Sequence, residues 1–240
     1  MGTSQSLSLK TTPNWASAKR AMSTIVRQRN AVTQQQVNSL LLNVSKAIIH
    51  DSNRSYGRSG GRIAKNFTQF ISLVRSNGIG AFVEQVSPGM DFADLSVKDV
   101  LLLIKKEISN PNPDEDHSTL DDLAARIAFE KLVAVIFSEI ETVPDLEDLL
   151  RNATENQLDA WMVEFQVEYI MELNGILFDA QIFSKGAEPD QIASQIRDFV
   201  RVKINEVYIV ERHQLNLLTP EGEQFVESLT LQILGIWAQE

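Results

Sequence analysis

The chain of 240 residues contains no cysteine. That absence excludes disulfides, thiolate zinc sites, iron–sulfur clusters and a cysteine nucleophile. Long hydrophobic runs are missing as well: the longest, LVAVIF at Leu132–Phe137, is far shorter than the roughly 18 residues of a membrane span. The opening segment has neither the basic start nor the apolar stretch of a secretory signal. We therefore expect a cytoplasmic protein without a membrane span.

Recognisable catalytic and ligand-binding motifs are also scarce. His50, His117 and His213 lie far apart in sequence and show no metal-ligand spacing, so we predict no metal site. Acid pairs such as Asp121-Asp122 are abundant, and we interpret them as a solvated helix face. The sequence thus predicts no catalytic residue and no cofactor, and hence not an enzyme. A hydrolase built from dispersed carboxylates is an alternative.

The net charge of −10 conceals a strong asymmetry along the chain. Residues 1–80 hold eleven basic residues and one acid, Asp51, whereas residues 81–240 hold 11 basic and 31 acidic residues. A basic first third can meet nucleic acid or an acidic partner. The alternative is that the two parts neutralise each other or present solvated helix faces. The dispersed basic residues and the lack of interleaved aromatic side chains favour this alternative.

Apolar residues recur at helical spacing, and all seven prolines lie where a helix can begin or a loop can run. These patterns predict helices near 13–30 and 33–50. They also predict a helix from Ile63 to about Asn77-Gly78, followed by a short separate helix that ends at Val86. Ser96 is expected to cap the next helix, and a long helix starts near Thr119. Within the long helix, LVAVIF is apolar on every side and is predicted to lie at the centre of a bundle.

The second half of the chain continues this pattern. FVRVKI at 199–204 alternates like a strand, but the surrounding apolar residues fit a helix, which we predict. Thr219 and Pro220 predict the start of the last helix. A further set of apolar and aromatic residues recurs at helical spacing and predicts a helix that faces the core rather than an aromatic cofactor site. These residues are Leu158, Trp161, Met162, Phe165, Tyr169, Leu173, Ile176 and Leu177.

The expected fold class is therefore all-α, an irregular multi-helix bundle with a flexible N-terminal tail. We predict the tail at residues 1–12 and one helical domain at 13–240. The acidic, proline-bearing link NPNPDEDHS provides a candidate subdomain boundary near 110–118.

The segment SYGRSGGR at Ser55–Arg62 places glycines and arginines before a helix. It lacks the order GxxxxGK[ST] of a nucleotide-binding loop, and no convincing strand precedes it. We interpret Asp51–Arg62 as a loop, with Arg54, Arg58 and Arg62 as candidate anion-contacting residues. They would contact phosphates if the chain were a nucleic-acid-binding module.

The first fifteen residues, MGTSQSLSLKTTPNW, carry a single charge, Lys10, and offer little to bury. Removal of Met1 before a small second residue would leave a free Gly2 amine, and Thr3 and Ser4 add little bulk. Such an amino end is suited to entering another protein's cleft, although an ordinary disordered terminus is the simpler interpretation. MGTSQS also fits the loose N-myristoylation pattern, a minor alternative.

Several segments together resemble a known family. They are the MGTS start, TPNW, the glycine- and arginine-containing stretch leading into RIAKNFTQFISLVRSNGIGAFVEQV, then DFADLSVKDVLLLI, STLDDLAARIAFEKLVAVI, WMVEFQVEYIMELNGILF and EGEQFVESLTLQIL. In this order they are similar to the QatB component of the bacterial Qat anti-phage defence system.

The resemblance implies a non-enzymatic subunit that acts beside a QueC-like protein, a P-loop ATPase and a TatD-like nuclease. QueC-like defence proteins are associated with attaching a deazaguanine group to an N-terminal glycine of a partner, and Gly2 matches that position. The segment QSLSLKTT departs from the glycine- and proline-rich tails typical of the family. The resemblance predicts that Gly2 is modified and that Gly2, Thr3 and Ser4 form the tail bound by the partner. It also predicts that the helical body binds partner subunits.

Overall fold

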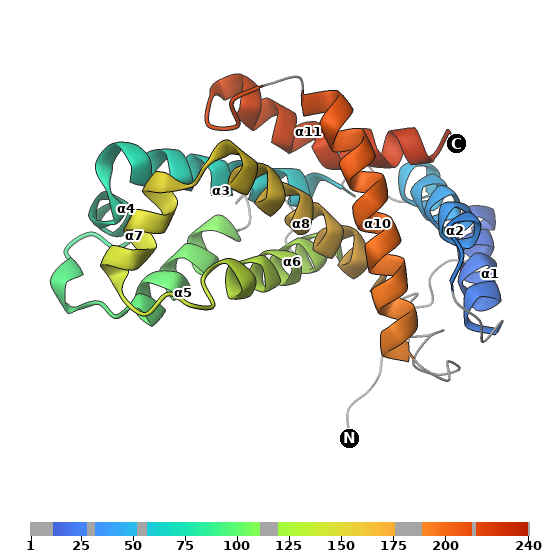
Figure 1. Ribbon diagram of the computed structural model, residues 1–240, viewed down its shortest axis with the longest axis horizontal. Coiled ribbons are helices and arrows are strands. Elements are labelled where there is room, and N and C mark those ends of the chain that lie inside the picture. Colours follow the sequence, from blue (N-terminus) through green and yellow to red (C-terminus); the bar gives the residue numbers. More distant parts are fainter. Residues whose placement is uncertain are drawn as a thin grey trace. The chain divides into compact units, whose positions relative to one another are not determined.

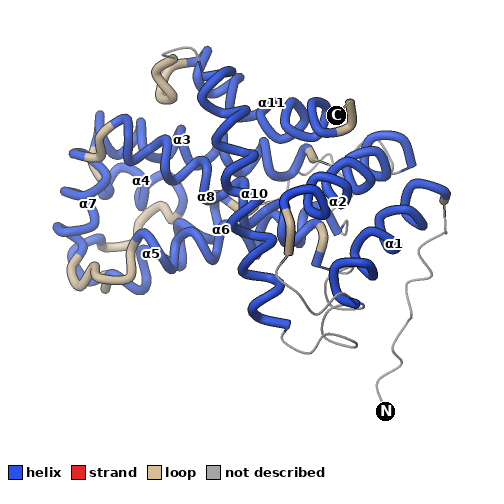
Figure 2. The backbone as a smooth tube through the Cα atoms, turned by 45° about the vertical axis from the view of Figure 1, so that its right-hand side comes forward, coloured by secondary structure: helices blue, strands red, loops and turns tan. Residues whose placement is uncertain are grey.

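The computed structural model describes residues 12–27, 32–51, 57–110, 120–175, 189–212 and 215–239. Every regular element in these ranges is helical (Figure 2), which confirms the predicted all-α, multi-helix class. The chain divides into two compact units: residues 1–56, 176–199 and 234–240 form the first, and residues 57–175 and 200–233 form the second. Most of the link that suggested a boundary near 110–118 lies outside the described residues.

The first unit contains the helices α1 (Pro13–Arg27) and α2 (Gln34–Lys46), which pack against each other (Figure 1). Trp15 and Met22 of α1 are buried. Thr33 and Gln36 form a capping box at the start of α2, in which each side chain accepts the other's backbone N–H. A π-helical turn, η1 (Ala47–Asp51), continues α2.

Two long helices, α10 (Pro189–Arg212) and α11 (Pro220–Trp237), contribute residues to both units. Within the first unit, the side-chain oxygen of Gln195 in α10 accepts a hydrogen bond of 2.9 Å from the N–H of Val32. The segment 199–204 lies inside α10, which confirms the predicted helix at this position.

The second unit is organised around α3 (Arg58–Asn77). This helix contacts α4 (Ile79–Val86), α5 (Val97–Ile108), α6 (Leu120–Ile136), α7 (Val143–Asn152) and α8 (Glu155–Leu173). A short 3₁₀ turn, η2 (Phe92–Asp94), precedes α5. Phe67 of α3 lies at the centre, with its ring 5.4 Å from that of Phe129 and 6.2 Å from that of Trp161.

The most enclosed part of this unit is the second half of α8. Residues 165–171 are all buried, including the polar Gln166 and Glu168. Thr230 of α11 donates a hydrogen bond to Gln166, and Lys131 of α6 pairs with Glu168. The ion pair compensates for the lost hydration of Glu168, and Thr230 satisfies the side-chain oxygen of Gln166, whereas the buried Nε2 of Gln166 has no hydrogen-bond partner among the described residues. The predicted core-facing helix is confirmed for its described residues.

The LVAVIF segment is less enclosed than its sequence predicted. Leu132 and Val133 are buried, but Val135 is 67% exposed. α6 packs on α3 and α8, and these helices cover only part of its surface. The prediction that this segment lies at the centre without an exposed face is therefore wrong.

Candidate functional site

Four of the predicted site residues, Gly2, Thr3, Ser4 and Arg54, lie outside the described residues. Arg58 and Arg62 are described, and both belong to α3, which begins at Arg58. The prediction that Asp51–Arg62 is a loop is therefore wrong from Arg58 onward.

α3 begins at Arg58 because a carboxylate of α6 caps it. Gly57 has φ of 88°, a left-handed conformation that favours glycine. One oxygen of Asp121 accepts the N–H of Gly57 at 2.8 Å, and the other accepts the N–H of Ser59 at 2.9 Å. The carboxylate satisfies free amides and complements the helix dipole. Asp121 is fully buried, so its interpretation as a solvated residue is wrong.

Two glycines allow other elements to approach the first turn of α3. A Cβ atom on Gly60 would lie 2.1 Å from the ring of Tyr169, and one on Gly61 would lie 2.0 Å from the backbone oxygen of Glu227. The Tyr169 hydroxyl also donates a hydrogen bond to Asp121. The glycines that suggested a nucleotide-type or mobile loop therefore serve close packing.

Arg62 is held by groups within the same unit. Its guanidinium pairs with Asp122 at 2.6 Å and donates to the backbone oxygen of Asn110. Arg126 pairs with the other carboxylate oxygen of Asp122, also at 2.6 Å. Asp122 is buried between the two arginines, which again contradicts the predicted solvated face. An external anion would have to compete with Asp122 for Arg62.

A cleft of about 720 Å³ lies beside Arg62. Arg58, Arg62 and Lys65 are its basic lining residues, and Glu227 is the acidic one. Lys65 pairs with Glu227 at 2.8 Å, so two of the three cations have acidic partners. Arg58 is exposed. The structure therefore brings Arg58 and Arg62 to one cleft, but it leaves little concentrated positive charge there.

A second polar cleft, of about 630 Å³, lies between α8 and α10. Tyr208 donates a hydrogen bond of 2.8 Å to Asp159, and the Arg212 guanidinium binds the same carboxylate. Burial, reinforced by the hydrogen bond to Asp159, raises the pKa of Tyr208 well above its ordinary value. The phenol stays protonated at neutral pH, as an ordinary tyrosine also does.

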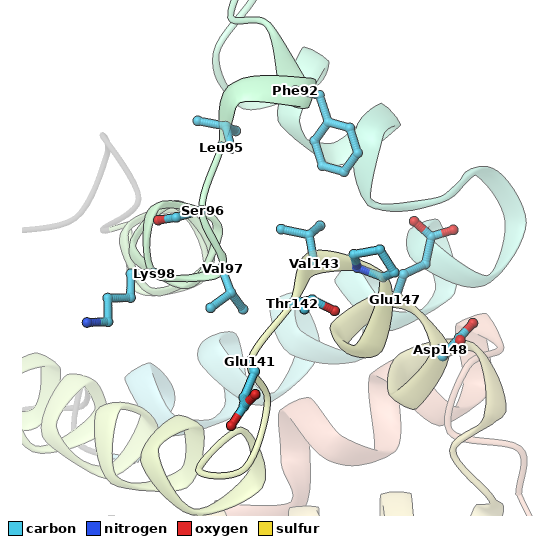
Figure 3. A pocket seen from close by; sticks show the side chains of 11 residues that line it. Phe92, Leu95, Ser96, Val97, Lys98, Glu141, Thr142, Val143, Glu147 and Asp148 are labelled. Atoms are coloured by element: carbon cyan, nitrogen blue, oxygen red, sulfur yellow. The ribbon is translucent and has the colours of Figure 1, made fainter.

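A third cavity, of about 850 Å³, opens between the starts of α5 and α7 (Figure 3). We call it the α5–α7 groove and define it by Phe92, Leu95, Ser96, Val97, Lys98, Glu141, Thr142, Val143, Pro144, Glu147 and Asp148. Apolar side chains from both sides face its centre, and exposed carboxylates lie at its edge.

Three polar side chains of this groove, those of Ser96, Thr142 and Glu147, already have partners. Ser96 accepts the N–H of Asp99, and Thr142 accepts the N–H of Asp145, each at 3.3 Å. These contacts cap α5 and α7, which confirms the predicted cap at Ser96. Glu147 accepts the N–H of Ile79 at the start of α4. The two helix starts are therefore occupied by their own caps.

Charge differs between the two units. Their complete sequence ranges hold nine basic and six acidic residues in the first unit, and 13 basic and 26 acidic residues in the second. The first unit thus carries a net charge of +3 and the second −13. Although α3 belongs to the basic third of the sequence, it is part of the acidic unit.

Within the described ranges, no group of histidine, aspartate and glutamate side chains is arranged to hold a metal ion. None of the helices there is both long and apolar enough to cross a bilayer. Comparison of the chain with protein-family models, curated proteins and solved structures gave no match.

Proposed function

We propose that this chain is a non-enzymatic subunit of an anti-phage defence system of the Qat type. In this proposal Gly2 is presented to a QueC-like partner for modification in the cytoplasm, and the helical body binds partner subunits. The observation that carries the proposal is the ordered set of QatB-like segments. Five of them overlap described helices: α3 with α4, α5, α6, α8 and α11.

The length of chain between Gly2 and the first described residue limits where the partner can bind. Gly2 precedes Thr12, the first described residue, by ten residues, and Trp15 of α1 is buried in the first unit. Ten residues of polypeptide reach at most about 35 Å when fully extended. The proposal therefore requires the QueC-like partner to bind close to α1. The P-loop ATPase is a second proposed partner, and the TatD-like nuclease a third.

Mass spectrometry of the N-terminal peptide tests the central claim. The chain is produced with and without its QueC-like partner, as wild type and as Gly2→Ala. Both second residues are small, so Met1 is removed from both proteins, and only the side chain at position 2 differs. Ser8→Ala serves as a matched control, because it lies in the tail but outside Gly2, Thr3 and Ser4.

We expect an added mass on wild type and Ser8→Ala only when the partner is present, and none on Gly2→Ala. An unmodified Gly2 in a system that protects cells from phage would refute the modification claim. Loss of protection in Gly2→Ala, with normal protein abundance, would connect the modification to defence.

The nucleic-acid alternative depends on Arg54, Arg58 and Arg62. Arg62 and Lys65 have acidic partners in the structure, so the cleft gives this alternative less support. If it were right, binding of a DNA or RNA duplex would weaken steeply as salt rises, because phosphate contacts release counterions. It would also weaken in Arg58→Glu. Absence of a gel shift even at low salt would exclude it.

A further inference from the structure

We propose that the α5–α7 groove binds a segment of a partner protein in which large apolar side chains are flanked by lysine or arginine. This inference gives a surface to the partner binding assigned above to the helical body. The identity of the partner rests on that proposed function. The argument for binding rests on the lining residues and charge of the groove.

The groove offers an apolar surface that its own unit does not cover. Phe92, Leu95, Val97 and Val143 surround its open centre in Figure 3, and all four are partly exposed. A cavity of about 850 Å³ lies within the roughly 300–1,000 Å³ typical of ligand clefts. It has room for several large side chains, and filling it would remove this surface from water.

Three polar lining residues of the groove, Ser96, Thr142 and Glu147, already have partners and are not free to orient a small polar ligand. Ser96 and Thr142 accept the backbone amides at the starts of α5 and α7. Glu147 accepts the N–H of Ile79 and pairs with Arg151 at 2.8 Å. Small-molecule sites usually add a few precisely placed polar contacts to an apolar lining. Here recognition has to come from apolar contact, as when a helix or short peptide lies in a groove.

The negative charge at the edge of the groove favours basic residues next to the apolar part of the bound segment. Glu141 and Asp148 are exposed and form no ion pair with any described residue. The basic lining residue, Lys98, points away from the centre in Figure 3. The unit as a whole carries −13. Basic residues beside the apolar anchor would therefore be attracted, and acidic ones repelled.

The two other clefts described above carry no comparable argument. Beside Arg62, two of the three cations, Arg62 and Lys65, are paired within the unit. Between α8 and α10, Arg201 binds Glu164 through both its Nε and its terminal nitrogen, and Arg212 binds Asp159. An incoming segment would have to displace these contacts.

Fluorescence anisotropy with two labelled probes tests the inference on the full chain. One probe is a short amphipathic helical peptide of leucine and lysine, and the other has glutamate in place of each lysine. We expect the full chain to bind only the lysine probe. Val143→Gln, which removes an apolar contact at a partly exposed position, should weaken binding at least about tenfold. Glu141→Lys combined with Asp148→Lys should weaken it about fivefold.

Matched variants control for surface chemistry and net charge. Val202→Gln makes the same replacement at an exposed position of α10. Glu84→Lys combined with Glu130→Lys makes the same charge change outside the groove. Both controls should bind the probe within about twofold of wild type, and circular dichroism should show all four variants to be folded.

Equal binding of the two probes, no binding of either, or equal loss in groove and control variants would overturn the inference. The result is independent of Gly2. An unmodified Gly2 would remove the proposed function and leave groove binding intact, whereas a groove that binds neither probe would leave the Gly2 measurement unaffected.

Discussion

The Tyr169 hydroxyl donates a hydrogen bond of 2.5 Å to Asp121, the same carboxylate that caps α3. Tyr169 and Asp121 are both fully buried. The contact therefore connects three helices, α3, α6 and α8, at a point from which water is excluded.

Removing either side of this contact should destabilise the second unit. We expect Tyr169→Phe to lower the free energy of unfolding by about 1.5–3 kcal/mol, because the lost bond is to a buried charged group. Asp121→Asn should cost more, since an amide can replace only one of the two accepting oxygens. Urea denaturation measures both effects, with the exposed Glu130→Gln of α6 as control. A neutral Tyr169→Phe would contradict the assigned bond.

The glycines of α3 make a second prediction possible. Gly61→Ala would place a Cβ atom against the backbone oxygen of Glu227, and Gly60→Ala would place one against the Tyr169 ring. Each should destabilise by at least about 1–3 kcal/mol, since the core would be overpacked. Gly235 of α11 has no atom within 4 Å of the corresponding position. Gly235→Ala should instead stabilise by about 0.5–1 kcal/mol, because alanine is the better helix former.

Thermal unfolding of the three variants gives the comparison. Gly235→Ala is the matched control, because it makes the same chemical change within a helix. If all three variants melted at the same temperature, close packing would not be the reason for Gly60 and Gly61.

Neighbouring aliphatic residues of α6 should respond in opposite ways to truncation. Leu132 is buried, whereas Val135 is largely exposed. Leu132→Ala should cost about 2–5 kcal/mol, through lost burial and the cavity left behind. Val135→Ala should change stability by less than about 0.5 kcal/mol. Comparable losses in urea denaturation would mean that Val135 is also enclosed, as the sequence predicted.

The capping box of α5 gives a pH-dependent prediction. Two hydrogen bonds from Ser96 lower the pKa of Asp99 below its ordinary value. The one from the Ser96 side chain has the larger effect, and the one from its backbone N–H the smaller. The stabilisation from this carboxylate is thus complete above the unfolded-state pKa of about 3.9 and is lost as pH falls through the folded-state pKa. Asp99→Asn should destabilise at neutral pH, and the difference from wild type should vanish in strong acid.

Unfolding free energies of both proteins, measured from about pH 6 to about pH 2, test this dependence. Ser96→Ala should move the pKa of Asp99 back toward its ordinary value. A difference between wild type and Asp99→Asn that stayed constant over the whole range would rule out the carboxylate as its source.

Local patterns predicted most of the described helices, because caps and apolar spacing are encoded over a few residues. Ser96 and Thr219 precede α5 and α11 as expected, and FVRVKI is helical despite its alternation. α7 was not predicted, although Thr142, Pro144 and Asp145 provide a starting signal of the same kind. Val143, Leu146 and Leu150 also follow helical spacing, so the signal for α7 is present in the sequence.

Contacts between residues that are distant in sequence could not be predicted from local patterns. Nothing near Gly57 shows that Asp121, 64 residues later, will cap α3, so the glycines and arginines there predict a loop. Asp122 was assigned to solvent for the same reason, because its partner Arg62 lies on another helix. The α5–α7 groove likewise combines segments that are distant in sequence, and only tertiary structure brings them together.

The cap that α6 supplies to α3 has a consequence for the order of folding. α2 carries its own cap in Thr33 and can close its first turn alone, whereas the first turn of α3 has to wait for α6 to dock. The amide hydrogens of Gly57 and Ser59 should therefore exchange with solvent deuterium when these two helices separate, so their protection reports the free energy of that separation.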